Sequence, residues 1–210
     1  PRRIVCRVRC VEGTGADDFL TKPINDVALL ARVRSLIRLK MMTDELRLRE
    51  QTSASFGVVS DPMTQVANGG RILAIEDREI YAGNIQKALG GEHTVEVTGD
   101  GDAAIEQARR GDFELIIVSL SLKGADGLRL CSHLRSMEET RQIPLLMLVD
   151  DTPDEMERLV KGLDLGVHDY LIRPVDANEL RARCRTQIRR KRYQDRLRTD
   201  YQKSMTLAVT

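Results

Sequence analysis

The feature that most constrains the fold of this chain is a series of five short apolar segments, which alternate with helical patterns between residues 71 and 190. Short strands that alternate with helices imply right-handed crossovers and a parallel sheet. Because most of the segments are continuous apolar runs, helices are expected to cover both faces of the sheet. The sequence therefore predicts an α/β fold whose five strands are Ile72–Ile75, Thr94–Val97, Leu115–Val118, Pro144–Val149 and Tyr170–Ile172.

Functional groups in such a sheet gather where the strands end. Ligands of open parallel sheets bind outside the carboxyl ends of the strands, near the point where the strand order reverses. No nucleophile paired with a general base and no glycine-rich phosphate loop is evident, so an independent enzyme is not favoured. The carboxyl-end rule selects Glu76, Asp77, Ser119, Val149, Asp150, Arg173 and Pro174.

Composition narrows the class of protein further. The 210 residues include 33 Lys and Arg against 32 Asp and Glu, so the net charge of +1 gives no general argument for a polyanionic partner. No apolar run is long enough to span a membrane, and no membrane partner is expected. The cysteines show no zinc-ligand spacing, and the expected location is a reduced cytoplasm. They are Cys6, Cys10, Cys131 and Cys184.

The chain also contains an internal repeat. Gly15–Lys40 aligns with Gly166–Lys191, with Gly, Asp, an aromatic residue, Leu, Pro, Leu and Arg at matching positions. A match over this length is far more specific than a short motif. Apolar residues at helical spacing continue from Val27 to about Gln51, where Gly, Pro, Ser and Asn begin a linker.

Residues 71–190 resemble a two-component receiver domain, and Gly15–Lys40 resembles the last strand and helix of another. Together with the helical extensions ARVRSLIRLKMMTDELRLRE and QIRRKRYQDRLRTDYQKSMTLAVT, they are similar to PleD-type response regulators. The resemblance implies a flavodoxin-like (βα)5 receiver. It also implies a first-receiver remnant over 1–50, a linker over 51–70, a second receiver over 71–190 and a signalling helix over 191–210.

A working receiver moves a phosphoryl group from a histidine kinase to its own aspartate. The family's chemistry needs a carboxylate nucleophile, two acids that hold Mg²⁺, a hydroxyl, and a lysine that precedes a cis proline. The resemblance places Glu76 and Asp77 at the acidic pair, Ser119 at the nucleophile (SLSLKGADG against the family's DLMMPGMDG), Val149 at the hydroxyl, and Arg173 before Pro174 at the lysine.

Three of these positions depart from the pattern. A serine hydroxyl at Ser119 forms only a phosphate ester and has no adjacent base, so it does not suit a reversible relay. Val149 donates no hydrogen bond, and the forked guanidinium of Arg173 does not replace a lysine. The second receiver is therefore predicted to be a pseudo-receiver. Glu76 and Asp77, without a third carboxylate, are predicted to be a solvated acidic edge, with no cofactor expected and Mg²⁺ binding weak.

The first receiver is expected to be the phosphorylated one. Thr21, Lys22 and Pro23 keep the family's lysine and proline. In the full-length protein the resemblance then makes a histidine kinase the partner of the first receiver. The family's output is a GGDEF diguanylate cyclase domain, which would begin where this chain stops, at Thr210; no GGDEF motif is present.

The last helix is strongly basic. Ten Lys and Arg lie between Arg181 and Lys203, opposed only by Asp195 and Asp200. Nucleic-acid binding is one interpretation, but a seam of Tyr193, Leu197 and Tyr201 favours packing against a partner or the receiver. The resemblance implies a homodimer, in which Arg181, Arg183 and Arg185 would meet Asp151, Asp154, Glu155 and Glu157 of a second copy.

The expected function is that of a non-phosphorylatable adaptor, whose dimerisation controls cyclic di-GMP synthesis by a cyclase domain in the full-length protein. The chain itself is not expected to be an enzyme. Two alternatives remain open: a receiver that accepts phosphate in its own right, for which Asp126 follows Ser119 in the same loop, and a nucleic-acid-binding regulator that uses the basic helix.

Overall fold

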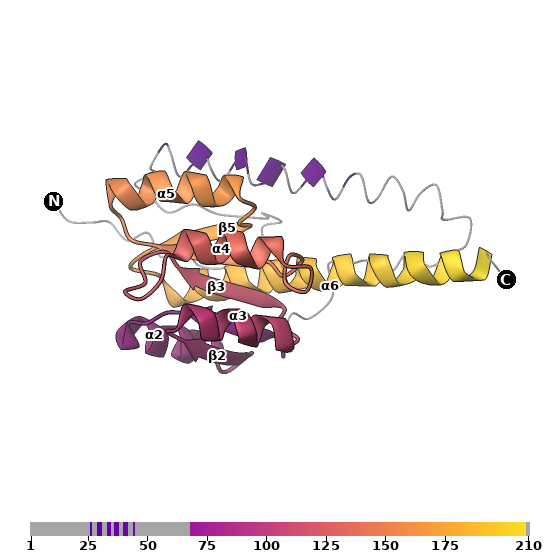
Figure 1. Cartoon of the computed structure of the whole chain (residues 1–210), viewed down its shortest axis with the longest axis horizontal. Helices are drawn as coiled ribbons and strands as arrows, with labels where there is room; N and C mark the ends of the chain where they lie inside the picture. Colours follow the sequence, from indigo (N-terminus) through magenta and orange to yellow (C-terminus); the bar gives the residue numbers. More distant parts are fainter. Residues whose placement is uncertain are drawn as a thin grey trace.

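Figure 1 shows a parallel sheet with helices on both faces and one long helix that continues past it. In this computed structural model the described residues are 68–208 and ten helical positions near the N-terminus, namely 26, 29, 30, 33, 34, 36, 37, 40, 41 and 44. The predictions for Cys6, Cys10, Lys22 and Pro23 lie outside the described residues, as does the linker up to residue 67.

The sheet confirms the predicted fold class. Its strands are β1 (Arg71–Ile75), β2 (Thr94–Thr98), β3 (Leu115–Ser119), β4 (Leu145–Val149) and β5 (Asp169–Ile172), arranged in the order β2-β1-β3-β4-β5. All neighbours are parallel. This is the flavodoxin-like order, whose switch point lies between β1 and β3. Because the strands run the same way, the residues after β1, β3, β4 and β5 meet at one edge.

Five helices complete this part of the chain. They are α2 (Glu79–Leu89), α3 (Gly101–Arg110), α4 (Gly127–Ser136), α5 (Pro153–Asp164) and α6 (Ala177–Ala208). Side chains alternate across a strand, so Leu73 and Ile75 join a core with α3, α4 and α5, whereas Ile72 and Ala74 join a core with α2 and α6. The two layers explain why these strands are apolar on both faces.

The expected core positions of Cys131 and Cys184 are confirmed. Both side chains are fully buried, Cys131 in the core under α4 and Cys184 in the core under α6. Burial raises the pKa of the Cys131 thiol to about 12 and also raises that of Cys184. Both cysteines are free thiols that behave as small apolar side chains.

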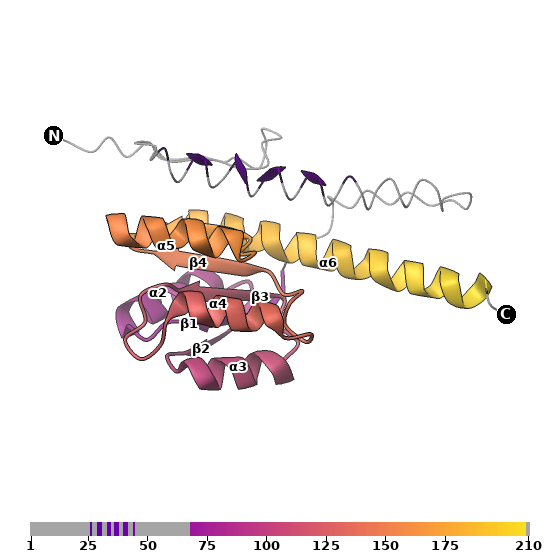
Figure 2. The same cartoon turned by 45° about the horizontal axis from the view of Figure 1, so that its top comes forward.

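The last helix begins at Ala177 and does not end with the sheet. Asp176 caps its first turn, because its Oδ1 accepts hydrogen bonds from the backbone nitrogens of Asn178 (2.8 Å) and Glu179 (3.1 Å). From there α6 runs 32 residues without interruption across residue 190. Figures 1 and 2 show its second half projecting beyond the sheet toward the C-terminus. No helix in the described ranges combines the length and hydropathy that a bilayer span requires.

Gly127 lets α4 begin directly against the end of β3. A Cβ at this position would meet the Ser119 carbonyl oxygen and lie 2.8 Å from the Leu120 Cα. Backbone atoms cannot yield as a flexible side chain can, so only glycine allows this approach. The start of α4 is therefore fixed against the residue that ends β3.

We expect Gly127→Ala to lower the free energy of unfolding by about 1–3 kcal/mol, because it overpacks the junction of α4 and β3. Urea unfolding at neutral pH measures the change. The matched control is Gly83→Ala in α2, where a Cβ meets nothing within 4 Å and a stabilisation of about 0.5–1 kcal/mol is expected. Equal effects of the two substitutions would contradict the close approach at Gly127.

Candidate functional site

Arg173 is the centre of a polar cluster at the carboxyl edge of the sheet. It directly follows β5, its backbone nitrogen donates to the Val149 carbonyl oxygen (2.8 Å), and its peptide bond to Pro174 is cis. The side chain is only 3% exposed. Its Nη2 donates to Glu76 Oε2 (2.5 Å) and to Ser119 Oγ (2.6 Å), and its Nη1 donates to Asp150 Oδ1 (3.0 Å). One guanidinium therefore joins the ends of four strands.

Glu76 is buried rather than solvated, so the predicted solvated acidic edge is wrong. Its side chain is 0% exposed. While Oε2 faces Arg173, Oε1 accepts from the backbone nitrogen (3.0 Å) and the Nε (3.2 Å) of Arg78. A buried carboxylate needs such donors, and two guanidiniums supply them.

Arg78 and Tyr81 complete the cluster from the start of α2. Arg78 Nη1 donates to Asp150 Oδ2 (3.1 Å), so Arg78 and Arg173 bind the two oxygens of one carboxylate. The Tyr81 ring lies against both guanidiniums, with centroid distances of 4.4 Å to Arg78 and 4.8 Å to Arg173. Such cation–π contacts hold the two cations beside the ring.

The charges in the cluster stabilise one another. Burial alone would raise the pKa of Asp150, but hydrogen bonds from Arg173 and Arg78 outweigh it and hold that pKa below its usual value. Burial alone would lower the pKa of Arg78, and the hydrogen bond to Asp150 and the charge of Glu76 instead raise it. Two cations thus face two anions, and the polar edge is neutralised from within.

Val149 and Asp77 lie near this edge but do not join the network. Val149 is fully buried at the end of β4, in the core that also holds Tyr170. Asp77 Oδ2 accepts from the backbone nitrogen of Lys123 (2.5 Å), while its buried Oδ1 has no hydrogen-bond partner. Of the sequence-selected residues, the structure therefore joins Glu76, Ser119 and Asp150 directly to Arg173.

The residues at this edge do not fit a divalent cation. Both oxygens of Glu76 accept hydrogen bonds from guanidinium groups, and Arg173 places positive charge between Glu76 and Ser119. The unpartnered Oδ1 of Asp77 supplies one free carboxylate oxygen, fewer than Mg²⁺ takes from protein and substrate together. Within the described ranges, no three His, Cys, Asp or Glu side chains are grouped as a metal site.

Much of the basic face of α6 is paired within the chain. Arg185 binds both Glu92 oxygens (3.0 and 2.8 Å), and Arg192 binds both Glu114 oxygens (2.5 and 2.8 Å). Arg181 Nη1 donates to the Ala88 carbonyl oxygen (3.0 Å). These contacts tie α6 to α2 and to the amino ends of β2 and β3.

The expected pairing of α6 arginines with acids of a second copy is wrong for two of its members. Arg183 is buried beside Glu179 (3.3 Å) and Asp169 (3.7 Å). Glu155 is also buried, and its Oε2 accepts from the Asp150 backbone nitrogen (2.5 Å). Side chains committed to the interior of one chain do not form a network between chains. Tyr193 lies in the described helix, whereas the side chains of Leu197 and Tyr201 lie outside the described residues.

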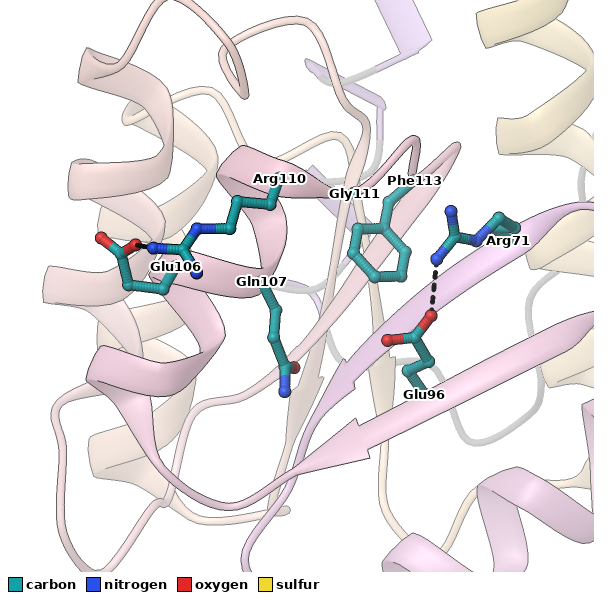
Figure 3. Close-up of a pocket in the computed structure, with 7 residues that line it drawn as sticks. All are labelled: Arg71, Glu96, Glu106, Gln107, Arg110, Gly111 and Phe113. Carbon is teal, nitrogen blue, oxygen red and sulfur yellow. Dashed lines mark hydrogen bonds and ion pairs between the residues drawn. The ribbon is translucent and has the colours of Figure 1, made fainter.

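A separate pocket of about 280 Å³ lies beside the end of α3 (Figure 3). Arg71 opens β1 at the amino edge, whereas Glu76 follows its carboxyl end. Ion pairs occupy the charged lining: Arg71 with Glu96 (2.7 Å) and Arg110 with Glu106 (3.0 Å). Arg71 also lies 5.0 Å from the Phe113 ring centroid. This pocket is therefore unrelated to the sequence-selected residues.

Comparison with known proteins assigns the family. Residues 72–185 match the response regulator receiver domain. The chain belongs to the response regulator receiver family. Over 198 residues it is 48% identical to the response regulator PleD of Caulobacter vibrioides, a match that covers 94% of this chain and 43% of that relative. The resemblance to PleD-type response regulators is thus confirmed, and the chain spans less than half of that relative's length.

Further relatives match a shorter part of the chain. The response regulator ArlR of Staphylococcus saprophyticus is 35% identical over 121 residues, which are 57% of this chain and 53% of ArlR. The receiver domain of the sensor histidine kinase PA1611 from Pseudomonas aeruginosa, solved with magnesium in its active-site cleft, has a TM-score of 0.50 at 25% identity and covers 57% of this chain and 98% of that chain.

The chemotaxis response regulator CheY4 of Vibrio cholerae shows the same fold, with a TM-score of 0.51 at 22% identity, covering 57% of this chain and 98% of that chain.

Receivers are regulatory rather than catalytic modules. They work with histidine kinases and commonly form dimers. The sequence selected Asp150 at this edge but did not predict its pairing with Arg173, nor the contacts of Arg78 and Tyr81. The only available signal was an arginine directly after the acidic pair.

We expect Arg173→Met to lower the free energy of unfolding by about 3–5 kcal/mol, because it leaves Glu76 buried beside an uncharged side chain. The double variant Glu76→Leu, Arg173→Met removes both charges and should recover most of that loss. Urea unfolding at neutral pH compares the two variants with the parent. A double variant no more stable than Arg173→Met would contradict the pairing.

A second prediction concerns pH. The pKa of Asp150 is lower in the folded chain, so its stabilisation is complete above the unfolded value of about 3.9 and is lost as pH falls through the folded value. Asp150→Asn should therefore cost about 1–3 kcal/mol at pH 7 and progressively less below pH 4. Urea titrations from pH 7 downward measure the difference. The control is the exposed Asp112→Asn, for which only a small change in stability is expected.

Proposed function

We propose that residues 71–190 form a pseudo-receiver, which acts as a non-phosphorylatable adaptor within a PleD-type response regulator. The observation that carries this proposal is the pairing of Ser119 with Arg173. Ser119 Oγ ends β3 at the position of the family's nucleophile, and the Arg173 guanidinium donates to it at 2.6 Å. In the family that position carries an aspartate and the position of Arg173 carries a lysine.

The chemistry around Ser119 opposes phosphorylation. A carboxylate attacks a phosphoryl donor as an anion and yields a mixed anhydride, whereas a neutral hydroxyl must lose its proton to an adjacent base. The group that faces Ser119 Oγ is a guanidinium, which is a donor and remains protonated in proteins. The hydroxyl is therefore held in a hydrogen bond and is not activated.

The position of the Arg173 guanidinium also leaves no role for a metal ion in the function that we propose. The solved receiver of PA1611 coordinates magnesium in its active-site cleft, whereas here the Arg173 guanidinium lies between Glu76 and Ser119. A fixed guanidinium supplies positive charge without exchangeable coordination sites. We therefore infer that Arg173 replaces the cation and keeps the edge in one arrangement.

A non-phosphorylatable adaptor must receive its signal from another receiver, and the internal repeat points to a first receiver in the longer protein. In the internal repeat, Val33 aligns with Cys184 and Ile37 with Ile188. Cys184 and Ile188 are fully buried against the sheet, whereas Val33 and Ile37 are 43% and 54% exposed. This apolar face suits a helix that packs on the sheet of a first receiver in the longer protein. That receiver would carry Lys22 and Pro23 and would accept phosphate from a histidine kinase.

The output domain of the full-length protein would follow α6. Because α6 runs unbroken from the receiver to Ala208, and Arg185 and Arg192 fix its first half by paired carboxylates, a rotation of the receiver moves the projecting half as well. We propose that two copies dimerise and that this geometry controls cyclic di-GMP synthesis by a diguanylate cyclase domain of the full-length protein. The buried thiols of Cys131 and Cys184 suit a reduced cytoplasm.

The two alternative functions have less support. Asp126 is committed as the N-cap of α4, since its Oδ1 accepts from the Leu128 nitrogen (2.8 Å) and from Arg158 Nη2 (2.7 Å). A second phosphoacceptor would have to break these bonds. Nucleic-acid binding would require free cations on α6, yet Arg185 and Arg192 are paired with Glu92 and Glu114.

Incubation with a small phosphodonor and Mg²⁺, followed by intact-protein mass spectrometry, tests the proposal. We expect no added phosphoryl group on the full chain. Ser119→Asp, Val149→Thr, Arg173→Lys restores the family's residues and is expected to gain an acid-labile phosphoryl group; Ser119→Ala, Val149→Thr, Arg173→Lys is the matched control. Stoichiometric labelling of the parent chain would refute the pseudo-receiver, whether or not the restored variant reacts.

A further inference from the structure

His93 is a buried histidine at the amino edge of the sheet, in the turn between α2 and β2. The residue is only 5% exposed. The backbone nitrogen of Gly70 donates to His93 Nδ1 (3.2 Å), and the buried Nε2 finds no hydrogen-bond partner among the described residues. A backbone N–H can only donate, so Nδ1 carries no proton and the ring is neutral. Protonation of the ring would therefore break the bond to Gly70 and bury a cation.

The His93 ring lies where the starts of three strands meet α6. Gly70, His93 and Glu114 directly precede β1, β2 and β3. A Cβ at Gly70 would lie 3.2 Å from His93 Nδ1 and 3.1 Å from Glu114 Oε2. The same point lies 2.9 Å from Ile188 Cδ1, which belongs to α6. The imidazole, the carboxylate and the apolar face of α6 therefore surround one position at this edge.

Two ion pairs beside His93 hold α6 on the sheet. Glu92 adjoins His93 in the same turn and binds Arg185 through both carboxylate oxygens (3.0 and 2.8 Å). Glu114 binds Arg192 in the same way (2.5 and 2.8 Å). These two carboxylates and two guanidiniums are the charged groups that face the ring. While His93 is neutral, each carboxylate is thus already bound to an arginine of α6.

A proton on His93 weakens this arrangement whichever way the carboxylates respond. If Glu92 and Glu114 stay with their arginines, a buried imidazolium is left without a hydrogen-bond acceptor. If a carboxylate turns to the imidazolium instead, the ion pair that ties it to α6 is lost. Burial and the charges of Arg185 and Arg192 outweigh the attraction of the two carboxylates, and they lower the pKa of His93.

We propose that His93 is a pH-sensitive latch, which holds the first half of α6 on the sheet while its ring is neutral and releases it when the ring is protonated. The signal is a proton, and the element that moves is the helix that leads toward the C-terminus. The latch lies at the edge opposite Arg173 and needs no phosphoryl group, so it goes beyond the pseudo-receiver role.

The two buried thiols provide the test. Release of α6 would expose Cys184, which is buried under α6, but not Cys131, which is buried under α4 on the other face of the sheet. The full chain is labelled with a disulfide reagent that reacts in weak acid, and each rate is divided by that of a short cysteine peptide at the same pH. At pH 5.5 we expect Cys184 to react faster than Cys131. Its rate should also be about three- to ten-fold higher than at pH 7.5, because the released state binds one more proton below the ordinary histidine pKa of about 6.5.

His93→Asn keeps a hydrogen-bond acceptor but has no titratable group, so the acceleration of Cys184 labelling is expected to disappear. The matched control His133→Asn removes an exposed histidine of α4 and should retain the acceleration. His168 is present in both variants, so its titration cancels from the comparison. Equal rates for Cys184 and Cys131 at pH 5.5 would indicate global unfolding and overturn the latch, as would an acceleration that persists in His93→Asn.

NMR titration of the parent chain measures the His93 ring directly, whether or not His93→Asn folds. The sequence contains three histidines, so the ring signals are few. We expect the midpoint of His93 to lie below the ordinary value of about 6.5. A midpoint at or above that value would overturn the proposal. None of these measurements involves Ser119 or a phosphodonor, so their failure would leave the pseudo-receiver proposal standing.

Discussion

The carboxyl edge of this receiver depends on the side chain of Arg173. A guanidinium that is only 3% exposed is stable only if its donors meet acceptors, and Glu76, Ser119 and Asp150 supply them. These partners end β1, β3 and β4, while Arg173 itself follows β5. The pairing therefore sets the relative positions of four strand ends.

Because arginines already bind Glu76, Asp150 and Ser119, this edge holds no exchangeable ligand on which a signal could act. An ordinary receiver uses exchangeable ligands, a cation and a phosphoryl group, to change the contacts at this edge. Here the positive charge is covalently part of the chain that leaves β5, and the hydroxyl of Ser119 is already bonded to it. In the adaptor role that we propose, a signal reaches this domain through neighbouring elements, and α6 is the element that leads from the sheet toward the C-terminus.

Local patterns predicted the fold well, because each strand and helix is specified by nearby residues. The strands of this sheet match their apolar runs within about one residue, and Cys131 and Cys184 lie where helical spacing placed them. The site was less predictable because its contacts are long-range. Glu76 and Arg173 are 97 residues apart, and nothing near Glu76 indicates that its charge is buried. The same holds for Arg183, whose exposed appearance on a basic helix hides a contact with Asp169.

The two edges of the sheet show why net charge is a poor guide to binding. The chain has a total charge of +1, yet the charges are not evenly compensated. At the carboxyl edge, two arginines face two carboxylates. At the amino edge, Arg135 is held by the Gly166 carbonyl oxygen and by His168, and such hydrogen bonds do not cancel a full charge. The energetic effect of each arginine therefore depends on the groups that face it within its own edge and not on the sum of charges over the chain.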